Sequence, residues 1–255
     1  MMTHGSLFSG VGGFEFGAEW AGIETLWNCE FEERKRRKLA KLFPNAYQFE
    51  DVRTMTNPPY VDIISGGFPC QDISLANVSN KKLVENGEIG IKGERSGLWS
   101  EMFRIVREVR PKYVIIENSP AIIIRGLEHI LCDLATIGYI CEWQRLSAEA
   151  FGFNHKRNRF FGVAYPCEIR RFHHSQVFRE IPEVLPKRTS GQTAVSMPTK
   201  RFNGSSDYGS VRLDDGFSTE IDRGFIEDTG NAVIPLIAQY MFECIKIHNN
   251  KTITL

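Results

Sequence analysis

Short apolar runs and longer amphipathic stretches alternate along the first 165 residues. The short runs predict strands at residues 5–8, 23–29, 61–65, 113–116, 140–146 and 159–164. Apolar residues at helical spacing predict helices at residues 14–21, 32–42, 98–109, 127–137 and 233–247. The run at 113–116, Tyr-Val-Ile-Ile, is continuously apolar, as in strands that are covered on both faces. The pattern therefore predicts an α/β fold with a doubly wound, mostly parallel sheet.

The alternation stops after Pro166. Residues 166–210 contain scattered Pro, Gly, Ser and Thr with little periodicity, and basic residues outnumber acidic ones there. A chain of 255 residues suits one or two domains at roughly 150 residues each. We expect a main domain at 1–165, a small basic region at 166–210 and a C-terminal segment at 211–255 that returns to the main domain.

Composition narrows the class of protein. Hydrophobic residues make up 42% and charged residues 24%, which is typical of globular chains and excludes disordered and coiled-coil ones. No apolar run reaches the roughly 18 residues of a membrane span, and no signal-peptide layout begins the chain. The six cysteines form no C-x-x-C pair, which argues against zinc and disulfides. We expect a cytoplasmic protein without a membrane or metal.

Charge alone indicates no partner. The 31 basic residues balance the 31 acidic ones, so the chain has no overall attraction to nucleic acid, although separate patches remain compatible with that total. The basic run at residues 34–38 is interpreted as the solvated face of a helix.

A glycine-rich turn and an acid follow the first two predicted strands, and a second acid comes about twenty residues later. The turn Phe8-Ser9-Gly10-Val11-Gly12-Gly13 would let a ligand approach bare backbone at a helix N-terminus. Glu30 ends the next strand, where a carboxylate can hold a ribose diol, and Asp51 could accept from an adenine amino group. Taken singly, the turn has an alternative interpretation as a purely structural turn, and each acid as a solvated loop carboxylate. Together they favour an adenosine-containing cofactor, and the absence of G-x-x-x-x-G-K-[ST] disfavours ATP and GTP.

The sharpest chemical candidate is Cys70. It lies in the loop Gly-Phe-Pro-Cys-Gln-Asp-Ile-Ser at 67–74, directly after a buried strand. An inert buried thiol is the default interpretation of a cysteine, but a thiol in a loop at the carboxyl end of a strand is a better nucleophile candidate.

Glu117 and a pair of arginines are the candidates for acid and charge. The strand at 113–116 places Glu117 in apolar surroundings, which should raise its pKa so that it donates a proton near neutral pH; the alternative is a purely local hydrogen-bonding role. Arg157 and Arg159 fall on one face of a strand and suit phosphate oxygens or a carbonyl, unless they are simply an exposed basic strand. The Gly-Asn-Ala-Val-Ile-Pro segment at 230–235 opens the last helix.

Taken together and in chain order, the segments described above resemble those of the cytosine-C5 DNA methyltransferases of bacterial or phage type. The 8–13 turn is similar to the family's first cofactor loop, and Pro69-Cys70-Gln71 to its Pro-Cys nucleophile motif. The 95–99 segment, Arg-Ser-Gly-Leu-Trp, is similar to the stretch after the catalytic loop, and Glu117-Asn118-Ser119 to the Glu-Asn-Val motif. Arg157-x-Arg159 resembles the basic pair, and 230–235 the closing motif. The resemblance implies a Rossmann-like fold that uses S-adenosyl-L-methionine, with residues 166–210 as a short target-recognition region.

The resemblance also implies roles for single residues. Cys70 would attack C6 of a flipped-out cytosine, while Glu117 would bind the ring N3 and the exocyclic amine. Asn118 would brace the Pro-Cys loop, and Arg157 and Arg159 would orient the cytosine. The implied cofactor-binding residues are Phe8, Gly10, Val11, Gly12, Gly13, Glu30, Phe31, Asp51, Val52, Pro69, Leu98, Asn231 and Val233.

The chain departs from the family pattern at three positions. Ser6 stands where many relatives have Asp, Ser119 replaces Val, and His155 replaces Gln. The implied partners are double-stranded DNA and either a cognate restriction endonuclease or a partner subunit. Two alternatives remain: a tRNA cytosine-C5 methyltransferase, although the Cys-Phe-Thr marker of that branch is absent, and a cofactor- and DNA-binding subunit that is inactive without a partner.

Overall fold

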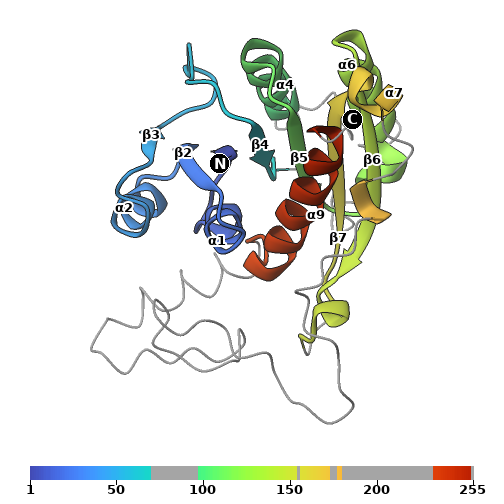
Figure 1. Ribbon diagram of the computed structural model, residues 1–255. Helices are drawn as coiled ribbons and strands as arrows, with labels where there is room; N and C mark the ends of the chain where they lie inside the picture. The colour runs from blue at the N-terminus through green and yellow to red at the C-terminus, as the bar shows by residue number, and fades with distance from the viewer. Residues whose placement is uncertain (70–96, 154–155, 173–176, 180–231, 254–255) are drawn as a thin grey trace, which may run out of the picture.

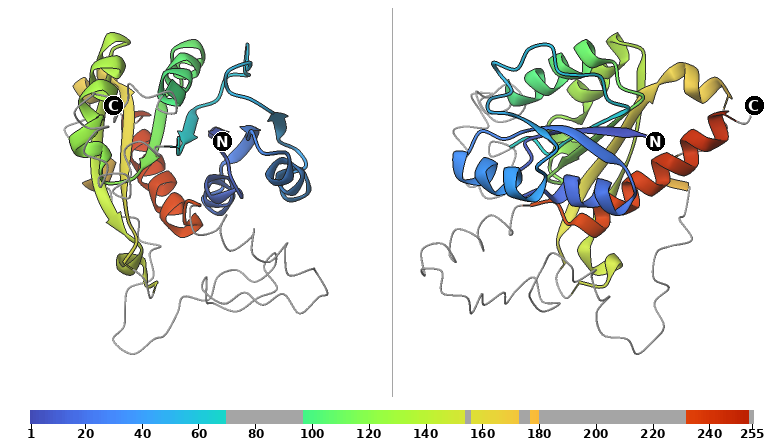
Figure 2. Two further views of the ribbon diagram at one scale, coloured as in Figure 1. Left: turned by 180° about the vertical axis from the view of Figure 1, so that it is seen from behind. Right: turned by 60° about the vertical axis from the view of Figure 1, so that its left-hand side comes forward.

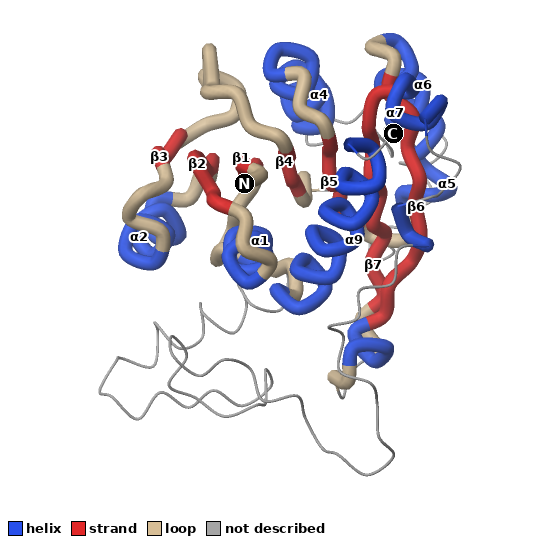
Figure 3. Tube along the Cα trace, viewed as in Figure 1, coloured by secondary structure: helices blue, strands red, loops and turns tan. Residues whose placement is uncertain are grey.

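A seven-stranded sheet runs through the centre of the computed structural model (Figures 1 and 3). The structure describes residues 1–69, 97–153, 156–172, 177–179 and 232–253. The strand order is β3-β2-β1-β4-β5-β7-β6. The strands are β1 Thr3–Leu7, β2 Glu24–Cys29, β3 Tyr47–Phe49, β4 Ile63–Gly66, β5 Tyr113–Asn118, β6 Tyr139–Ser147 and β7 Asn158–Pro166.

The first five strands in chain order and β6 run in the same direction, and β7 alone is antiparallel to them. β1 pairs with β2 on one side and with β4 on the other, so the chain winds outward in both directions from β1. β7 pairs antiparallel with β5, and β6 with β7. The prediction of a doubly wound, mostly parallel sheet is thereby confirmed, and the antiparallel strand β7 lies between β5 and the edge strand β6.

Helices cover both faces of this sheet. α1 and α9 lie side by side on one face, and α4 and α6 lie on the other (Figures 1 and 2). The helices are α1 Gly13–Trp20, α2 Glu33–Leu42, α4 Gly97–Val109, α5 Ile122–Arg125, α6 Leu127–Thr136, α7 Cys167–Phe172 and α9 Pro235–Ile253, with 3₁₀ turns at Ala148–Phe151 and Val177–Arg179.

The two faces of β5 explain why its sequence is continuously apolar. Val114 and Ile116 are fully buried in the cluster that includes α4 and α6. Tyr113 and Ile115 are equally buried in the cluster on the opposite face, with α1 and α9. Because side chains alternate along a strand, only an uninterrupted apolar run can serve both layers. Each such side chain contributes about 1.5–3 kcal/mol through its burial.

Two glycines of α1 allow α9 to pack closely. A Cβ atom at Gly13 would lie 2.2 Å from the Val233 carbonyl oxygen, and one at Gly17 would lie 2.5 Å from the Ala238 Cβ. Neither distance is compatible with a larger residue, because backbone and Cβ atoms cannot withdraw as a flexible side chain would. The segment from Val233 onward therefore completes a core that it shares with α1.

Some elements differ from the sequence-based expectation. β3, α5 and α7 are additional, and α7 gives residues 167–172 a helix in a stretch that was expected to be irregular. The last helix begins at Pro235 instead of residue 233, and β7 begins at Asn158, one residue after Arg157. The division into regions at 165 and 210 stays a prediction, since residues 180–231 lie outside the described part. Among the residues that the structure describes, no helix is both long and apolar enough to span a membrane.

Candidate active site

The loops that carry the candidate residues leave one edge of the sheet. Leu7 of β1 is aligned with Cys29 of β2 and with Gly66 of β4, and Gly66 is aligned with Ile116 of β5. These four positions are the last or nearly the last of parallel strands, so the segments that follow them emerge together. Ligands of open α/β sheets bind at this carboxyl edge.

The glycine-rich turn after β1 adopts a left-handed backbone at three positions. Phe8 has φ of 56°, Gly10 of 58° and Gly12 of 93°. The Gly12 N–H donates to the Ser9 carbonyl over 2.9 Å, and α1 begins at the next residue. The backbone at Gly10 is therefore open, as expected where a ligand approaches closely, whereas a Cβ atom at Gly12 would meet Phe43 and one at Gly13 would meet Val233, so those two glycines serve packing.

Glu30 is held between this turn and the start of α2. Its Oε2 accepts a 2.8 Å hydrogen bond from the Gly10 N–H, and its Oε1 accepts a 2.9 Å bond from the Glu32 N–H. A carboxylate offers about four acceptor directions. Each oxygen therefore retains capacity for one further donor, which is what binding of two vicinal hydroxyls requires.

Phe31, Asp51 and Arg53 form a contact on the surface beside Glu30. The Phe31 ring is 69% exposed, an unusual environment for a large apolar side chain. The Arg53 guanidinium lies over it, 5.3 Å from the ring centroid. The same guanidinium is bidentate to Asp51, with Nη2 2.7 Å from Oδ2 and Nε 3.0 Å from Oδ1. Hydrogen bonding from Arg53 lowers the pKa of the Asp51 carboxyl, and Val52 between them is buried.

Glu15 is a buried acid beneath the turn, in the first turn of α1. Its side chain is completely buried, and burial raises its pKa to about 7. The Ser9 and Ser6 hydroxyls offset part of this rise, whereas the charge of Glu30 adds to it. Ser9 also donates to Ser6 over 3.0 Å, so the residue at the position of the family's Asp takes part in a hydrogen-bonded group.

Glu117 lies near the end of β5 and is 7% exposed. Its Oε1 is 3.1 Å from Arg159 Nε, across the antiparallel pairing of β5 with β7. Burial raises the pKa of Glu117, and the charges of Arg159 and Arg157 limit the rise. The expected upward direction is thus confirmed. Burial, followed by repulsion from Arg159, also lowers the pKa of Arg157 to about 10.

The loop that leads to Cys70 is fixed at its root. The Asn118 Nδ2 donates to the buried Phe68 carbonyl over 3.1 Å, and the Asn118 Oδ1 accepts from the Ser119 N–H over 2.8 Å. A Cβ atom at Gly67 would lie 2.7 Å from Glu117 Oε2, so a larger residue there would displace the carboxylate of the acid. Cys70 itself follows Pro69 directly in the sequence and lies outside the described residues.

The other expected cofactor residues are distributed over the same edge. Leu98 is in the first turn of α4 and packs against the core cluster that contains Phe68 and Trp99. Val233 approaches Gly13 at the start of α1. Asn231 and His155 lie outside the described residues. The structure therefore gathers Glu30, Phe31 and Asp51 at one end of the edge, and Glu117, Asn118 and both arginines at the other.

Comparison with known proteins identifies the family. A model of the C-5 cytosine-specific DNA methylases matches residues 2–207. The chain belongs to this family. Among curated relatives of the chain, the match to the type II methyltransferase M2.BsuMI of Bacillus subtilis is 32% identical and covers 62% of the chain. The match to M.Sau3AI of Staphylococcus aureus is 30% identical and covers 69%.

The chain is short beside these relatives. It spans 41% of the length of M2.BsuMI and 45% of the length of M.Sau3AI. A solved structure of similar size comes from Escherichia coli and is described as a DNA modification methyltransferase encoded within a prophage. It has a TM-score of 0.65 and 17% identity, and the match covers 98% of this chain and 100% of that one. At this identity the likeness shows the fold, a Rossmann-like methyltransferase sheet.

Sequence reasoning missed Arg53 and Glu15 as members of this edge. Arg53 carried a weak signal, because it stands two residues after Asp51 in an otherwise uncharged segment, 52–57. Glu15 carried almost none. A polar residue in the first turn of a helix is ordinarily solvated, and only the packing of α1 reveals its burial.

Proposed function

We propose that this chain is a DNA (cytosine-5-)-methyltransferase that acts on a cytosine extruded from duplex DNA. The observation that carries the proposal is Glu117: a buried acid with a raised pKa that contacts Arg159 and lies against the root of the Cys70 loop. A carboxyl in this state can donate a hydrogen bond or a proton to a ring nitrogen near neutral pH. A stacked base is out of its reach, so the cytosine has to be flipped out at a cost of about a few kcal/mol.

The residues of the chain divide the reaction among them. The Cys70 thiolate adds to C6 of the cytosine and forms a carbon–sulfur bond. Glu117 donates to N3 and accepts from the exocyclic amine, so negative charge does not accumulate on the ring. Arg159 and Arg157 orient the base, and Asn118 holds the Phe68 carbonyl and with it the start of the Cys70 loop. Loss of the C5 proton after methyl transfer expels the Cys70 thiolate.

We infer that S-adenosyl-L-methionine is held at the other end of the edge. Glu30 retains acceptor capacity for the ribose diol, Phe31 offers an exposed ring for adenine, and Asp51 is an acceptor for the adenine amine. The open backbone at Gly10 gives the ligand room near the N-terminus of α1. These residues fit the molecule, which when bound supplies a methyl group on a sulfonium centre.

The test is methyl transfer from tritiated S-adenosylmethionine to cytosine-containing duplex DNA, followed by digestion and identification of the labelled base. Labelled 5-methylcytosine from the wild-type chain and none from Cys70→Ala is the expected result. Label in tRNA alone would favour the RNA-modifying alternative. Because the chain spans less than half the length of its curated relatives, transfer that requires an added protein would favour a partner-dependent subunit.

Names of the curated relatives suggest the biological setting. They are type II methyltransferases, which motivates the proposal that this chain protects DNA in the cytoplasm together with a cognate restriction endonuclease. Resistance of DNA from expressing cells to a panel of endonucleases would reveal both the activity and its target sequence.

A further inference from the structure

Arg53 makes contacts that resemble those of a bound base. Its guanidinium is planar and lies over the Phe31 ring at 5.3 Å. Its Nε and Nη2 donate to Asp51, and both carboxylate oxygens are engaged. A guanidinium stacks on aromatic rings and binds carboxylates in this geometry readily. Arg53 thus uses the flat face of one residue and the acceptor atoms of the other.

An adenine ring at the proposed cofactor site would use the same two groups. It would stack on Phe31 and donate its amine to Asp51. Glu30 differs, because its oxygens are bound only by backbone N–H groups, which a ribose would leave in place. The side chain of Arg53 therefore overlaps with the needs of adenine, whereas nothing comparable covers Glu30 in the described part of the chain.

We propose that the Arg53 side chain occupies the adenine subsite of the ligand-free protein and has to swing out when the cofactor binds. The inference rests on the proposed function, because it assumes that Phe31 and Asp51 receive adenine. Arg53 would then lower cofactor affinity by the fraction of molecules in which it covers the site.

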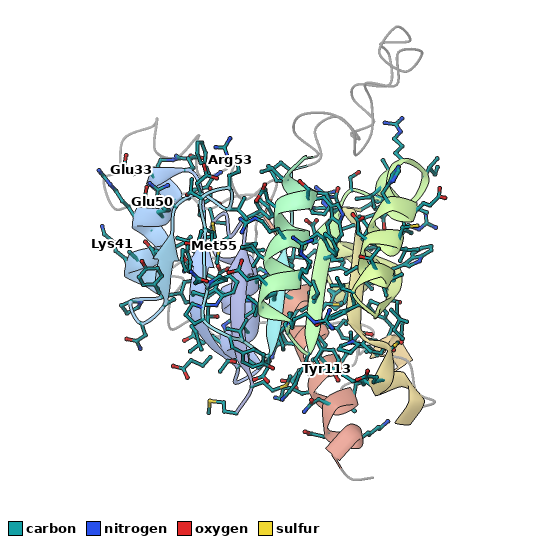
Figure 4. The ribbon with its side chains drawn as sticks, turned by 90° about the horizontal axis from the view of Figure 1, so that it is seen from above. Glu33, Lys41, Glu50, Arg53, Met55 and Tyr113 are labelled. Carbon is teal, nitrogen blue, oxygen red and sulfur yellow. The ribbon has the colours of Figure 1, made fainter. Side chains whose placement is uncertain are left out.

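The surroundings of Arg53 allow this movement. Its side chain is 58% exposed, and it lies at the edge of the molecule far from Tyr113 at the start of β5 (Figure 4). Exposed ion pairs and exposed cation–π contacts are individually weak. The Arg53 backbone N–H separately donates to Asp51 Oδ1 over 3.0 Å. Asp51 therefore stays oriented when the guanidinium leaves, and a substitution at Arg53 preserves the acceptor.

The test measures binding of S-adenosylhomocysteine by calorimetry and stopped flow, without DNA. We expect Arg53→Ala to bind it roughly three- to twentyfold more tightly, mainly through a faster association rate, because the two weak contacts no longer compete. Arg53→Lys retains the charge but not the planar guanidinium, so its affinity should lie between those of the wild type and Arg53→Ala. Arg37→Ala is the matched control, since it removes an exposed arginine paired at 2.6 Å with Glu33 on α2 and should leave binding unchanged.

Ionic strength gives a second measurement. Salt screens exposed charges, so affinity of the wild type should rise between low and high salt more steeply than that of Arg53→Ala. Unchanged or weaker binding by Arg53→Ala would overturn the inference, and a slower dissociation rate in the wild type would show that Arg53 instead holds the bound ligand. If the wild type and Arg53→Ala both fail to bind, the proposed cofactor site is wrong, and the inference fails with it.

Discussion

The two ends of the sheet edge each carry an acid paired with an arginine, and the two acids behave in opposite ways. On the surface, Arg53 Nη2 lies 2.7 Å from Asp51 Oδ2, and the pKa of Asp51 is lowered. Glu117 and Arg159 are 3.1 Å apart, but Glu117 is buried and its pKa is raised. The arginine determines the direction of the pKa shift of Asp51, whereas the loss of hydration determines that of Glu117. An adjacent arginine therefore does not by itself reveal the charge of an acid.

Glu15 extends the comparison to a third environment. It is even more buried than Glu117, and the described groups that shift its pKa are two serines, its own backbone N–H and the charge of Glu30, with no arginine among them. Its pKa rises to about 7. The three acids thus show the separate effects of burial and of ion pairing on the pKa of a carboxyl group. Each effect can be tested by removing one carboxylate.

The largest effect is expected at the buried pair. Glu117→Gln keeps the shape of the side chain but removes its proton-donating carboxyl. Positioned acids contribute about 10²–10⁴-fold to rates, so we expect single-turnover methylation to fall at least a hundredfold while S-adenosylhomocysteine binding stays near the wild-type value. A loss of less than about tenfold would show that Glu117 is only a structural partner of Arg159.

Glu15→Gln should change stability in a pH-dependent manner. The unfolded carboxyl ionises near 4.5 and the folded one near 7, so the folded state holds more protons between these values and stability falls as the pH rises through them. The variant lacks this loss. We compare the free energies of unfolding of the variant and the wild type by urea unfolding at two pH values. The difference, variant minus wild type, should be about 3 kcal/mol larger at pH 8 than at pH 4. Glu19→Gln, at an exposed position of the same helix, is the control, and a similar pH dependence there would refute the assignment to Glu15.

The smallest effect is expected at the exposed pair. Asp51→Asn removes the charge that Arg53 binds, yet exposed ion pairs contribute little to folding. The urea midpoint should match that of Glu33→Gln, which disrupts the exposed Glu33–Arg37 pair of α2. Binding of S-adenosylhomocysteine should weaken only in Asp51→Asn. A large loss of stability in Asp51→Asn would mean that the Asp51–Arg53 pair supports the fold as a buried pair would, and the contrast with Glu117 and Arg159 would be wrong.

The sequence predicted the elements whose signal is local and strong. The continuous run of β5 and the amphipathic face of α4 were both recognisable, because burial on two faces or on one leaves distinct periodicities. β3 has three residues and an exposed Tyr47, so it carries no such signal. α5 and α7 are likewise too short to establish a period.

The candidate site was predictable where the chemistry coincides with a strand end. Glu30 and Glu117 follow this rule, whereas Asp51 follows β3, a strand that the sequence did not predict. Arg53 was missed because its importance depends on where a flexible side chain lies relative to Phe31, which no spacing rule encodes. The burial of Glu15 depends on the packing around α1, and that helix meets α9 from more than 200 positions away in the sequence.

The contact of Gly13 with Val233 and of Gly17 with Ala238 has a consequence for how the polypeptide can be divided. A protein cut within residues 180–231 would leave two fragments that carry complementary parts of one core, with Ile237, Met241 and Ile245 of α9 completing the cluster of the larger piece. Such fragments should reassemble when they are mixed. The fold is therefore suited to fragment complementation.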